Sequence, residues 1–510
     1  MEAGEIVVRE GVSLNDALRQ AREWRRTNDV RCQGGITIRL QPGSHYMQEP
    51  LFIRPEDSGT ETSPLVIQGE TGAIICGDPR QQHTQLWPTE GMERMIGFDT
   101  ATRTITIPTP PRSILKKLQK EEHLEMVVHQ RWAIAILRVK ALTVHGDSVA
   151  VTFLEPESRL EFEHPWPQPV IGGERGNSSF LLRTTEQRDG IERLVCIDGT
   201  YNHPVEHVQL QGLTFENTCW NRPLHLGHVT LQGGFPLVDA YKLAVPGLPW
   251  DSTLENQAWI ERPVSAVSVN YGNHISIKDC HFRHLGATAL DFKSGEWSQI
   301  EGCTFEDIGG TAIMAGSFAE SPREVHRPYG DLAGYCSALV IKGNTISNAT
   351  VEDWGAVGIG CGYVNAVIID GNTVNHVNYS GICVGWGWTP AYTGAENNHI
   401  INNRVSDYAR QLYDAGGIYT LSYQPWSTIS GNVVSQPTAA PYATNDRAFC
   451  IYLDARTDGF TLENNTTVNN SVLSGFPAEG TVVGGFAADT RPIRRDEIGD
   501  NHPGPNLIFR

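Results

Sequence analysis

A short phrase recurs through the second half of the chain and constrains the fold more than any other feature. Each copy places an apolar pair, two linking residues, then an Asn or Cys and another apolar residue, as in Ile368 to Val374. The asparagines in successive copies are 28, 31, 29 and 33 residues apart, at Asn344, Asn372, Asn403, Asn432 and Asn465. A period of about one supersecondary unit is typical of a stacked solenoid and not of a closed globule.

The composition of each phrase predicts strands. The phrases are short, are bounded by Gly or Asn, and carry β-branched residues at alternate positions. Stacked strands place equivalent residues ~4.8 Å apart, so we expect the asparagines to form a ladder whose side-chain amides hydrogen-bond along the stack. Cys280 and Cys303 hold the same position in earlier phrases and are interpreted as small packing residues. The sequence predicts an all-β, right-handed parallel β-helix.

The repeat divides the chain unevenly. Ser13 is a candidate N-cap for an amphipathic helix over residues 13–26, which would close the open end of the solenoid. Gly43 to Tyr46 is interpreted as a turn between two of the first coils. A second excursion from the repeat runs from about Trp220 to Glu261. The predicted domains are an N-terminal cap with the first coils (1–84), a β-rich inserted domain (85–200), the main β-helix with a catalytic groove (201–475) and a C-terminal tail or cap (476–510).

Composition and charge exclude several classes of function. The 510 residues carry a formal net charge of −18 without clustered Lys and Arg, which argues against a nucleic-acid partner. No run approaches the ~18 apolar residues of a membrane span. The ten cysteines show no C-x-x-C spacing and the histidines no H-E-x-x-H spacing, so neither a metal nor another cofactor is expected. The N-terminus shows no charged segment followed by an apolar run, which predicts a cytoplasmic location, or a secreted one if a leader was trimmed.

Period-two alternation indicates which side chains of the last coils face outward. The strands that follow the ladder positions align on Ile359, Ile382, Ile418 and Ile451. With these isoleucines pointing inward, alternation sends Tyr419, Tyr452 and Asp454 outward. The last coils are therefore predicted to present a carboxylate and two phenols on one outer face.

A trough is predicted beside Asp454. Its outer column also contains Gly385 and Gly362, which leave space next to the carboxylate. Trp386 and Trp388 follow at once and are predicted to wall this trough with flat apolar faces of the kind that hold sugars. Further aromatic residues are candidate sugar contacts, with a core or stacking role as the alternative; these are Trp354, Tyr379, Tyr419 and Tyr452.

Two carboxylates are the minimum equipment for hydrolysing a glycosidic bond, one to protonate the leaving oxygen and the other to act as base or nucleophile. Asp454 is the first candidate and Asp414, in the preceding coil, is the second. Each has a structural alternative, because Asp is common in turns: Asp454 would end a strand, and Asp414 would hydrogen-bond the Gly416–Gly417 turn.

The spacing of the two aspartates raises a geometric objection. With Ile418 stacked on Ile451, Asp414 and Asp454 are offset by seven residues, or ~23 Å along a straight strand. Catalytic carboxylate pairs lie ~5 to 9.5 Å apart. The pair therefore requires a bend, which the two glycines permit. Glu352 and Asp353, on an earlier coil, are reserve candidates for the catalytic acids, with a solvated turn as their alternative role.

The residues carry a resemblance to a known family. The chain resembles the right-handed β-helix glycosidases of glycoside hydrolase family 141, which include α-L-fucosidases and xylanases, over most of its length. The resemblance implies that the aspartate before Gly-Gly-Ile-Tyr and the aspartate after Ile-Tyr-Leu, here Asp414 and Asp454, are the catalytic pair. The stretches that carry it are Ser13, Gly43 to Tyr46, Pro50-Leu51, Asp57 to Thr60, Gly381 to Trp388, Asp414 to Leu421 and Ile451 to Asp454.

The leading hypothesis is therefore an O-glycoside hydrolase acting on a plant or microbial glycan or oligosaccharide. A polysaccharide lyase is the first alternative, although that chemistry uses Lys or Arg beside calcium-binding carboxylates and the sequence shows no such cluster. A non-catalytic glycan-binding solenoid is the second, because function lies in the site and not in the fold. All three hypotheses share a carbohydrate partner.

Overall fold

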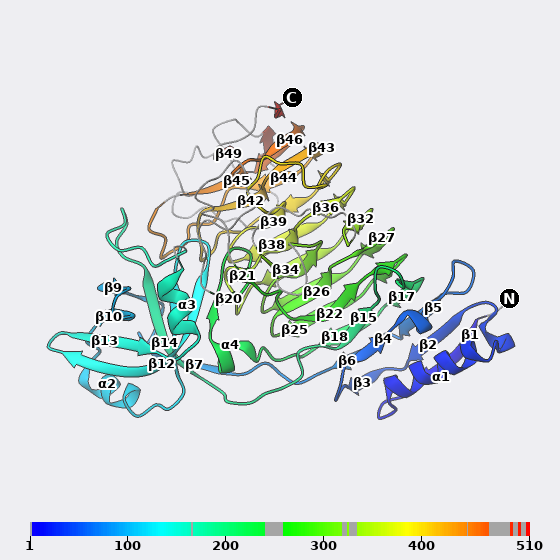
Figure 1. Ribbon diagram of the computed structural model, residues 1–510, viewed down its shortest axis with the longest axis horizontal. Helices are drawn as coiled ribbons and strands as arrows, with labels where there is room; N and C mark the ends of the chain where they lie inside the picture. Colours follow the sequence, from blue (N-terminus) through cyan, green and yellow to red (C-terminus); the bar gives the residue numbers. More distant parts are fainter. Residues whose placement is uncertain are drawn as a thin grey trace.

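Three long sheets wind around one core and form a β-helix (Figure 1). Their strands pair in parallel, except that the last pair in one sheet is antiparallel. The computed structural model describes residues 3–164, 167–239, 259–318, 324–325, 334–445, 447–468, 490–492, 498–500 and 506–509. Each coil contributes one strand to each sheet, and the stack runs from the N-terminal end to the C-terminal end of the chain. The predicted right-handed parallel β-helix, with its N-terminal helix and β-rich insertion, is confirmed.

The strands of the three sheets are as follows. The first sheet is β1 (Gly4–Val8), β2 (Ile36–Leu40), β5 (Leu65–Gly69), β17 (Val208–Gln211), β24 (Ser276–Lys278), β28 (Gln299–Glu301), β33 (Val340–Lys342), β37 (Ile368–Asp370), β40 (His399–Ile401), β43 (Tyr423–Ser430), β46 (Asp458–Glu463) and β50 (Ile508–Phe509). The second is β4 (Leu51–Ile53), β15 (Val195–Asp198), β22 (Ser265–Asn270), β26 (Thr288–Phe292), β30 (Ile313–Ala315), β35 (Ile359–Cys361), β39 (Ile382–Val384), β42 (Ala415–Thr420), β45 (Ala448–Leu453) and β49 (Ile498–Asp500). The third is β3 (Gly43–Tyr46), β6 (Ala73–Cys76), β18 (Thr214–Glu216), β25 (His281–Leu285), β29 (Thr304–Ile308), β34 (Thr345–Ala349), β38 (Thr373–Val377), β41 (Arg404–Val405), β44 (Val433–Ser435), β47 (Thr466–Val468) and β48 (Thr490–Pro492).

The asparagine ladder has the predicted geometry. Asn372 lies fully buried between its neighbours in the stack. Its Oδ1 accepts hydrogen bonds from the backbone amide and the Nδ2 of Asn344, both at 2.9 Å, and its own Nδ2 donates to Oδ1 of Asn403 at 3.0 Å and to the carbonyl of Ile341 at 2.9 Å. The pattern continues through Asn432 to Asn465. The ladder therefore satisfies turn backbone that cannot reach water.

The core consists of the inward residues of all three sheets. Ile359, Ile382, Ile418 and Ile451 stack in register in the second sheet, as the sequence predicted, and each is fully buried. Each step of such a stack removes apolar side chains from water, and this burial is the main stabilising contribution to the solenoid.

Helix α1 (Leu14–Arg26) covers the N-terminal end of the stack (Figure 1). Ser13 is its N-cap, with Oγ accepting from the amide of Asp16 at 3.3 Å. Arg22 fixes the helix to the 3-10 turn η2 (Pro55–Asp57) through two hydrogen bonds to Asp57, at 2.8 and 2.7 Å. The predicted capping helix is confirmed.

The turn predicted at Gly43 to Tyr46 is wrong. These residues form β3, which pairs in register with β6. His45 points into the core, where it is 3% exposed, and its Nε2 lies 2.9 Å from the carbonyl oxygen of Gln41. Because this inward position is a histidine and not an apolar residue, the strand has a polar sequence pattern that resembles that of a turn.

The inserted domain is an antiparallel sheet beside the stack (Figure 1). It lies between His83 and Thr185, and Val195 already pairs in the second sheet of the β-helix. Two helices, α2 (Arg112–Leu118) and α3 (Glu157–Glu163), accompany it. Its strands are β7 (His83–Trp87), β8 (Glu93–Arg94), β9 (Gly97–Asp99), β10 (Thr104–Pro108), β11 (Leu124–His129), β12 (Ile134–His145), β13 (Ser148–Phe153) and β14 (Ser179–Thr185), with β19 (His228–Val229) pairing on β12.

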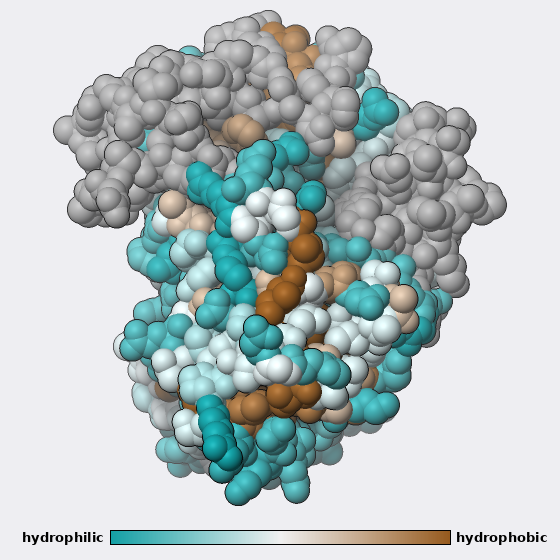
Figure 2. Space-filling view, turned by 90° about the vertical axis from the view of Figure 1, so that its left-hand side faces the viewer, coloured by the Kyte–Doolittle hydropathy of each residue, from teal (hydrophilic) through white to brown (hydrophobic). Residues whose placement is uncertain are grey.

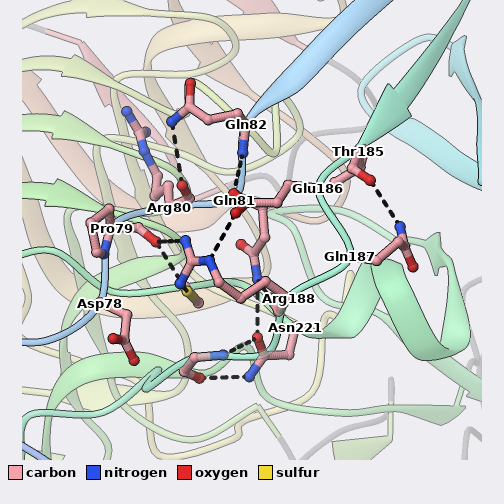
Figure 3. Close-up of polar contacts among 12 residues, drawn as sticks. Asp78, Pro79, Arg80, Gln81, Gln82, Thr185, Glu186, Gln187, Arg188 and Asn221 are labelled. Carbon is pink, nitrogen blue, oxygen red and sulfur yellow. Dashed lines mark hydrogen bonds and ion pairs between the residues drawn. The ribbon is translucent and has the colours of Figure 1, made fainter.

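The two segments that enter and leave this domain are tied to each other (Figure 3). Gln81 Nε2 donates to the carbonyl of Arg188 at 3.0 Å, and the Arg188 guanidinium donates to the carbonyl of Pro79 at 2.8 Å. The amide of Glu186 donates to the carbonyl of Gln82 at 2.9 Å. These bonds connect the two chain segments that join the inserted domain to the β-helix.

The second excursion and the edges of the coils add short elements. Helix α4 (Arg222–Leu226) and β20 (Leu237–Asp239) lie between the inserted domain and the stack (Figure 1). The other short elements are η1 (Val30–Cys32), β16 (Val205–Glu206), β21 (Trp259–Ile260), β23 (Gly272–Asn273), β27 (Gly295–Glu296), β31 (Glu324–Val325), β32 (Cys336–Ser337) and β36 (Val364–Asn365). Most of the predicted C-terminal segment 476–510 lies outside the described residues.

The face that carries the inserted domain is mainly hydrophilic where it is described, with short apolar strips (Figure 2). Within the described ranges, no helix is both long and apolar enough to cross a membrane.

Candidate active site

Asp414 and Asp454 lie at opposite ends of two paired strands. Asp414 directly precedes β42, and Asp454 directly follows β45. In the pairing, Ile418 lies beside Ile451 and Tyr419 beside Tyr452, as the sequence alignment predicted. The seven-residue offset is therefore real, and the two carboxylates are brought together by other means.

The first means is a sharp bend at Gly416. A Cβ added there would lie 2.7 Å from the carbonyl oxygen of Ile418, two residues ahead, and 2.9 Å from Cβ of Tyr452. In a straight strand two residues span ~6.6 Å, so the chain folds back at this point. Asp414 itself has a φ of 58°, and its amide donates to the carbonyl of Arg447. The glycine is required because a side chain would collide with the neighbouring strand.

The second means is a pair of tyrosine side chains that span the gap between the carboxylates. Tyr452 donates a hydrogen bond to Oδ1 of Asp414 at 3.0 Å, and Tyr419 donates to Oδ2 of Asp454. The two rings touch edge to face, with centroids 5.2 Å apart. Each aspartate is thus held by one ring of the same pair. Burial is the main cause of the raised pKa of Asp414, and the negative charge of Asp454 adds to it.

The environment favours the protonated form of Asp414. Burial raises its pKa above the ordinary value, the Arg447 guanidinium opposes this, and the negative charge of Asp454 adds to the rise. The net direction is upward. Asp454 is 9% exposed, so it is accessible only along one edge. A carboxyl with a raised pKa beside a second carboxylate is the arrangement expected of a general acid and its partner.

Two arginines that sequence reasoning missed lie around Asp414. Arg447 is 3.3 Å from its Oδ1 and 2.5 Å from the Tyr452 hydroxyl oxygen. Arg131, in the turn between β11 and β12 of the inserted domain, lowers the pKa of Asp414 through its charge and accepts the amide of Tyr413 on its carbonyl at 3.1 Å. The inserted domain therefore contributes to this site.

A neutral histidine fastens the same turn to the site. Burial lowers the pKa of His129 to about 4. Its Nε2 lies 2.7 Å from the carbonyl oxygen of Gln411, an acceptor, so this nitrogen carries the proton. The contact holds the loop that ends at Asp414.

Tyr379 lies behind the site. It is fully buried, its hydroxyl donates to the backbone carbonyl of Asp414 at 3.0 Å, and it accepts from Nε2 of Gln232 at the same distance. The structure thus places this predicted sugar contact against the backbone of the candidate acid, where it holds the loop.

The predicted tryptophan walls lie in an apolar cluster next to the tyrosines. Trp386 and Trp388 are 4% and 8% exposed, and their rings touch at 5.0 Å. Trp386 also packs on Phe235 and Phe318 and shares the lining of a small apolar cavity with Tyr419. Trp354 is half-buried against the β-helix core. Among the six predicted aromatic contacts, Tyr419 hydrogen-bonds the carboxylate of Asp454 and Tyr452 that of Asp414.

The reserve candidates lie elsewhere and fasten other parts of the protein. Glu352 is 3.0 Å from His83 Nε2 in the inserted domain. Burial would raise the pKa of Glu352, but its contacts with His83 and the charges of nearby arginines lower it overall. Asp353 pairs with His228 Nε2 at 2.9 Å and accepts the amide of Gly355. Among the described residues, no group of three or more Cys, His, Asp or Glu is placed to hold a metal ion.

Comparisons with known proteins agree with this architecture. The family model of the GH141 insertion domain matches residues 80–188, and that of a right handed beta helix region matches residues 329–491. A solved glycoside hydrolase is 30% identical with a TM-score of 0.86, over 99% of this chain and 96% of that one.

Other matches are weaker. A XylC complex with xylose is 10% identical with a TM-score of 0.41, over 90% of this chain and 69% of that one. A GH136 lacto-N-biosidase from Eubacterium ramulus is 11% identical with a TM-score of 0.37, over 100% and 68%. None of the curated proteins matches the chain.

Proposed function

The chain belongs to the right-handed β-helix glycoside hydrolases of the family 141 type, and from this premise we propose that Asp414 and Asp454 cleave an O-glycosidic bond in a plant or microbial glycan. The observation that carries the proposal is the tyrosine pair whose hydroxyls hydrogen-bond the two carboxylates, with the pKa of Asp414 raised by burial. A buried carboxyl with a raised pKa and a second aspartate held by the same tyrosine pair would supply the acid and the base or nucleophile that the reaction needs.

In this mechanism Asp414 is the general acid. Its raised pKa keeps the proton available for the leaving oxygen, because burial and the charge of Asp454 both disfavour ionisation. As Asp414 loses its proton, the Arg447 guanidinium at 3.3 Å and the Tyr452 hydroxyl at 3.0 Å stabilise the new carboxylate.

Asp454 is the base or nucleophile. The hydroxyl of Tyr419 donates a hydrogen bond to Oδ2 of Asp454, and this bond would orient the carboxylate toward a water molecule or the anomeric carbon. A tyrosine from the neighbouring coil thus orients the attacking group, as the reaction requires a fixed line of approach.

A screen of aryl glycosides and plant-wall oligosaccharides tests this function. Proton NMR of the first product would show both cleavage and the anomer formed, and with it whether Asp454 acts as base or nucleophile. An unsaturated product that absorbs in the ultraviolet would assign the site to a lyase. Binding without turnover by any substrate would assign the protein to the glycan-binding alternative.

Changing Arg447 to Gln should move the pH profile of kcat. The Arg447 charge lowers the pKa of Asp414, so its removal raises that pKa. A general acid loses activity as pH rises through its pKa, and the alkaline limb of the profile should therefore shift to higher pH. The matched control is Arg410→Gln, in the loop that ends at Asp414, where the arginine pairs with Asp407 at 3.3 Å. A shift to lower pH in the Arg447 variant would contradict the acid role of Asp414.

A further inference from the structure

A second cavity lies on the same side of the β-helix, ahead of the candidate active site. It has a volume of about 330 Å³. One wall comes from the second excursion, through Trp220, Arg222 and His228, and the other from loops that precede strands of the second sheet, at Thr288, Thr311 and Ala356. We call it the distal pocket. The catalytic roles considered for Asp414, Asp454, Glu352 and Asp353 do not account for this pocket.

We propose that the distal pocket is a glycosyl-binding subsite for a neutral sugar unit of an extended glycan, so that the enzyme recognises an oligosaccharide and not one terminal sugar. The inference rests on the proposed function for its meaning in catalysis. Its volume accommodates one sugar ring with its hydration, and its lining combines an aromatic surface with hydrogen-bonding groups, as sugar sites do.

The aromatic surface is the indole of Trp220. This side chain is half-buried, and its ring meets the imidazole of His228 edge to face, with centroids 4.6 Å apart. His228 in turn is 2% exposed and paired with Asp353 at 2.9 Å. The indole is therefore held in one orientation before any ligand arrives.

The charges around the pocket are largely paired. Arg222 bonds Glu261 at 2.7 Å, Arg262 bonds Asp291 at 2.6 Å, and His228 bonds Asp353. Paired charges offer donors and acceptors side by side without a net field. Sugar hydroxyls both donate and accept, so this lining suits a neutral sugar better than a uronate or a sulfated unit.

The excursion wall is fixed by its first residues (Figure 3). Oδ1 of Asn221 accepts from the amide of Gly190 at 3.2 Å and from Gln81 Nε2 at 3.1 Å, and its Nδ2 donates to the Gly190 carbonyl at 2.8 Å. The Asn221 amide donates to Glu192 at 2.8 Å. A wall that is ordered in the free protein spares a ligand the cost of ordering it.

The distal pocket adjoins the small apolar cavity beside Tyr419. Gly233 and Thr311 line both this pocket and the small apolar cavity beside Tyr419, the residue that bonds Asp454. Ala356 belongs to the coil of β35, and the coil of β42 is two steps further along the stack, or ~10 Å. A ligand that reaches both sites must therefore contain several linked sugar units.

Glycan-array binding by the Asp454→Asn protein tests the proposal, because it measures binding without turnover. The probes are neutral and acidic glycans of one to six units. We expect binding to neutral glycans of three or more units, and Trp220→Ala should weaken it at least about tenfold. Trp220→Phe keeps a flat ring and most of the packing, so it should weaken glycan binding less than Trp220→Ala does. If the alanine variant has a lowered melting temperature, the test rests on the phenylalanine variant. The control is Tyr201→Ala, which removes an aromatic side chain that is 65% exposed.

Three outcomes would overturn the subsite: no glycan bound, acidic glycans bound alone, or equal affinity with and without the Trp220 ring. Turnover of aryl monoglycosides by the protein with Asp454 intact reports the proposed function separately. If the parent protein turns over none of the aryl monoglycosides, the catalytic proposal is refuted. The array result still tests the subsite independently.

Discussion

Changing Asp454 to Asn should lower kcat by about 10³-fold or more on the best substrate while the protein still melts cooperatively near its normal temperature. Asn has the same shape and still accepts the Tyr419 hydroxyl hydrogen bond, but it cannot take a proton or attack carbon. Kinetics on the substrate found by the glycoside screen, together with a thermal melt, would check both parts. Asp370→Asn, on the outer side of the first sheet, serves as the control and should keep full activity.

A structural role for Asp454 predicts the opposite pattern. The residue lies at the end of β45, and its amide donates to the carbonyl of Thr420 at 3.0 Å through the backbone, which the substitution keeps. Loss of several degrees of melting temperature with most of the activity retained would therefore assign the carboxylate to the turn and contradict the catalytic role.

Asp414→Asn should also inactivate the enzyme, and it should raise stability at neutral pH. The pKa of Asp414 is raised in the folded protein, so its contribution to stability is present in acid and is lost as pH rises through the folded-state pKa. Above that pKa the buried charge is a cost that Asn removes. Melting temperatures at pH 4 and pH 7 would check this, and the gain of the variant should appear at pH 7 only. A variant that is less stable at pH 7 would contradict the prediction.

The repeat made the β-helix predictable because the interaction that produces the repeat lies between neighbouring coils. An asparagine that must bond the coils on both sides recurs once per coil, and its spacing reports the length of the coil. Isoleucines at fixed distances from it then set the register of the second sheet, so that Ile418 and Ile451 were aligned correctly from the sequence.

The details of the site were less predictable because they depend on departures from that frame. The ~23 Å estimate assumed a straight strand, whereas the chain bends at Gly416 and tyrosine side chains bridge the remaining distance. The tryptophans were assigned to the outer trough because they directly follow Gly385 in the sequence. Gly385 and Gly387 have φ values of 116° and 92°, so the chain leaves the strand after Val384 and alternation no longer applies.

The contribution of the inserted domain had no sequence signal. Arg131 approaches Asp414 across a separation of 283 residues, and the contact depends on how a separate sheet docks on the stack. The sequence did indicate an addition to the repeat in the second excursion, which contains Trp220 and His228.

Changing Asn372 to Ala should destabilise the protein by roughly 3–5 kcal/mol. The side chain is fully buried, and its removal leaves the backbone amide of Asn344 without its 2.9 Å acceptor and the carbonyl of Ile341 without its 2.9 Å donor. Each buried polar group left unsatisfied costs about 1–3 kcal/mol. Chemical denaturation would measure the change in the free energy of unfolding.

Asn375→Ala is the matched control, since Asn375 lies three residues further along the same coil and its Oδ1 lies 3.1 Å from Nδ1 of the exposed His376. Its effect should stay within about 0.5 kcal/mol. Equal and small effects of the two substitutions would mean that water enters the ladder and satisfies the freed groups. The stack would then owe its stability to the apolar core, and the asparagines would serve to set the register of the coils that hold the catalytic strands.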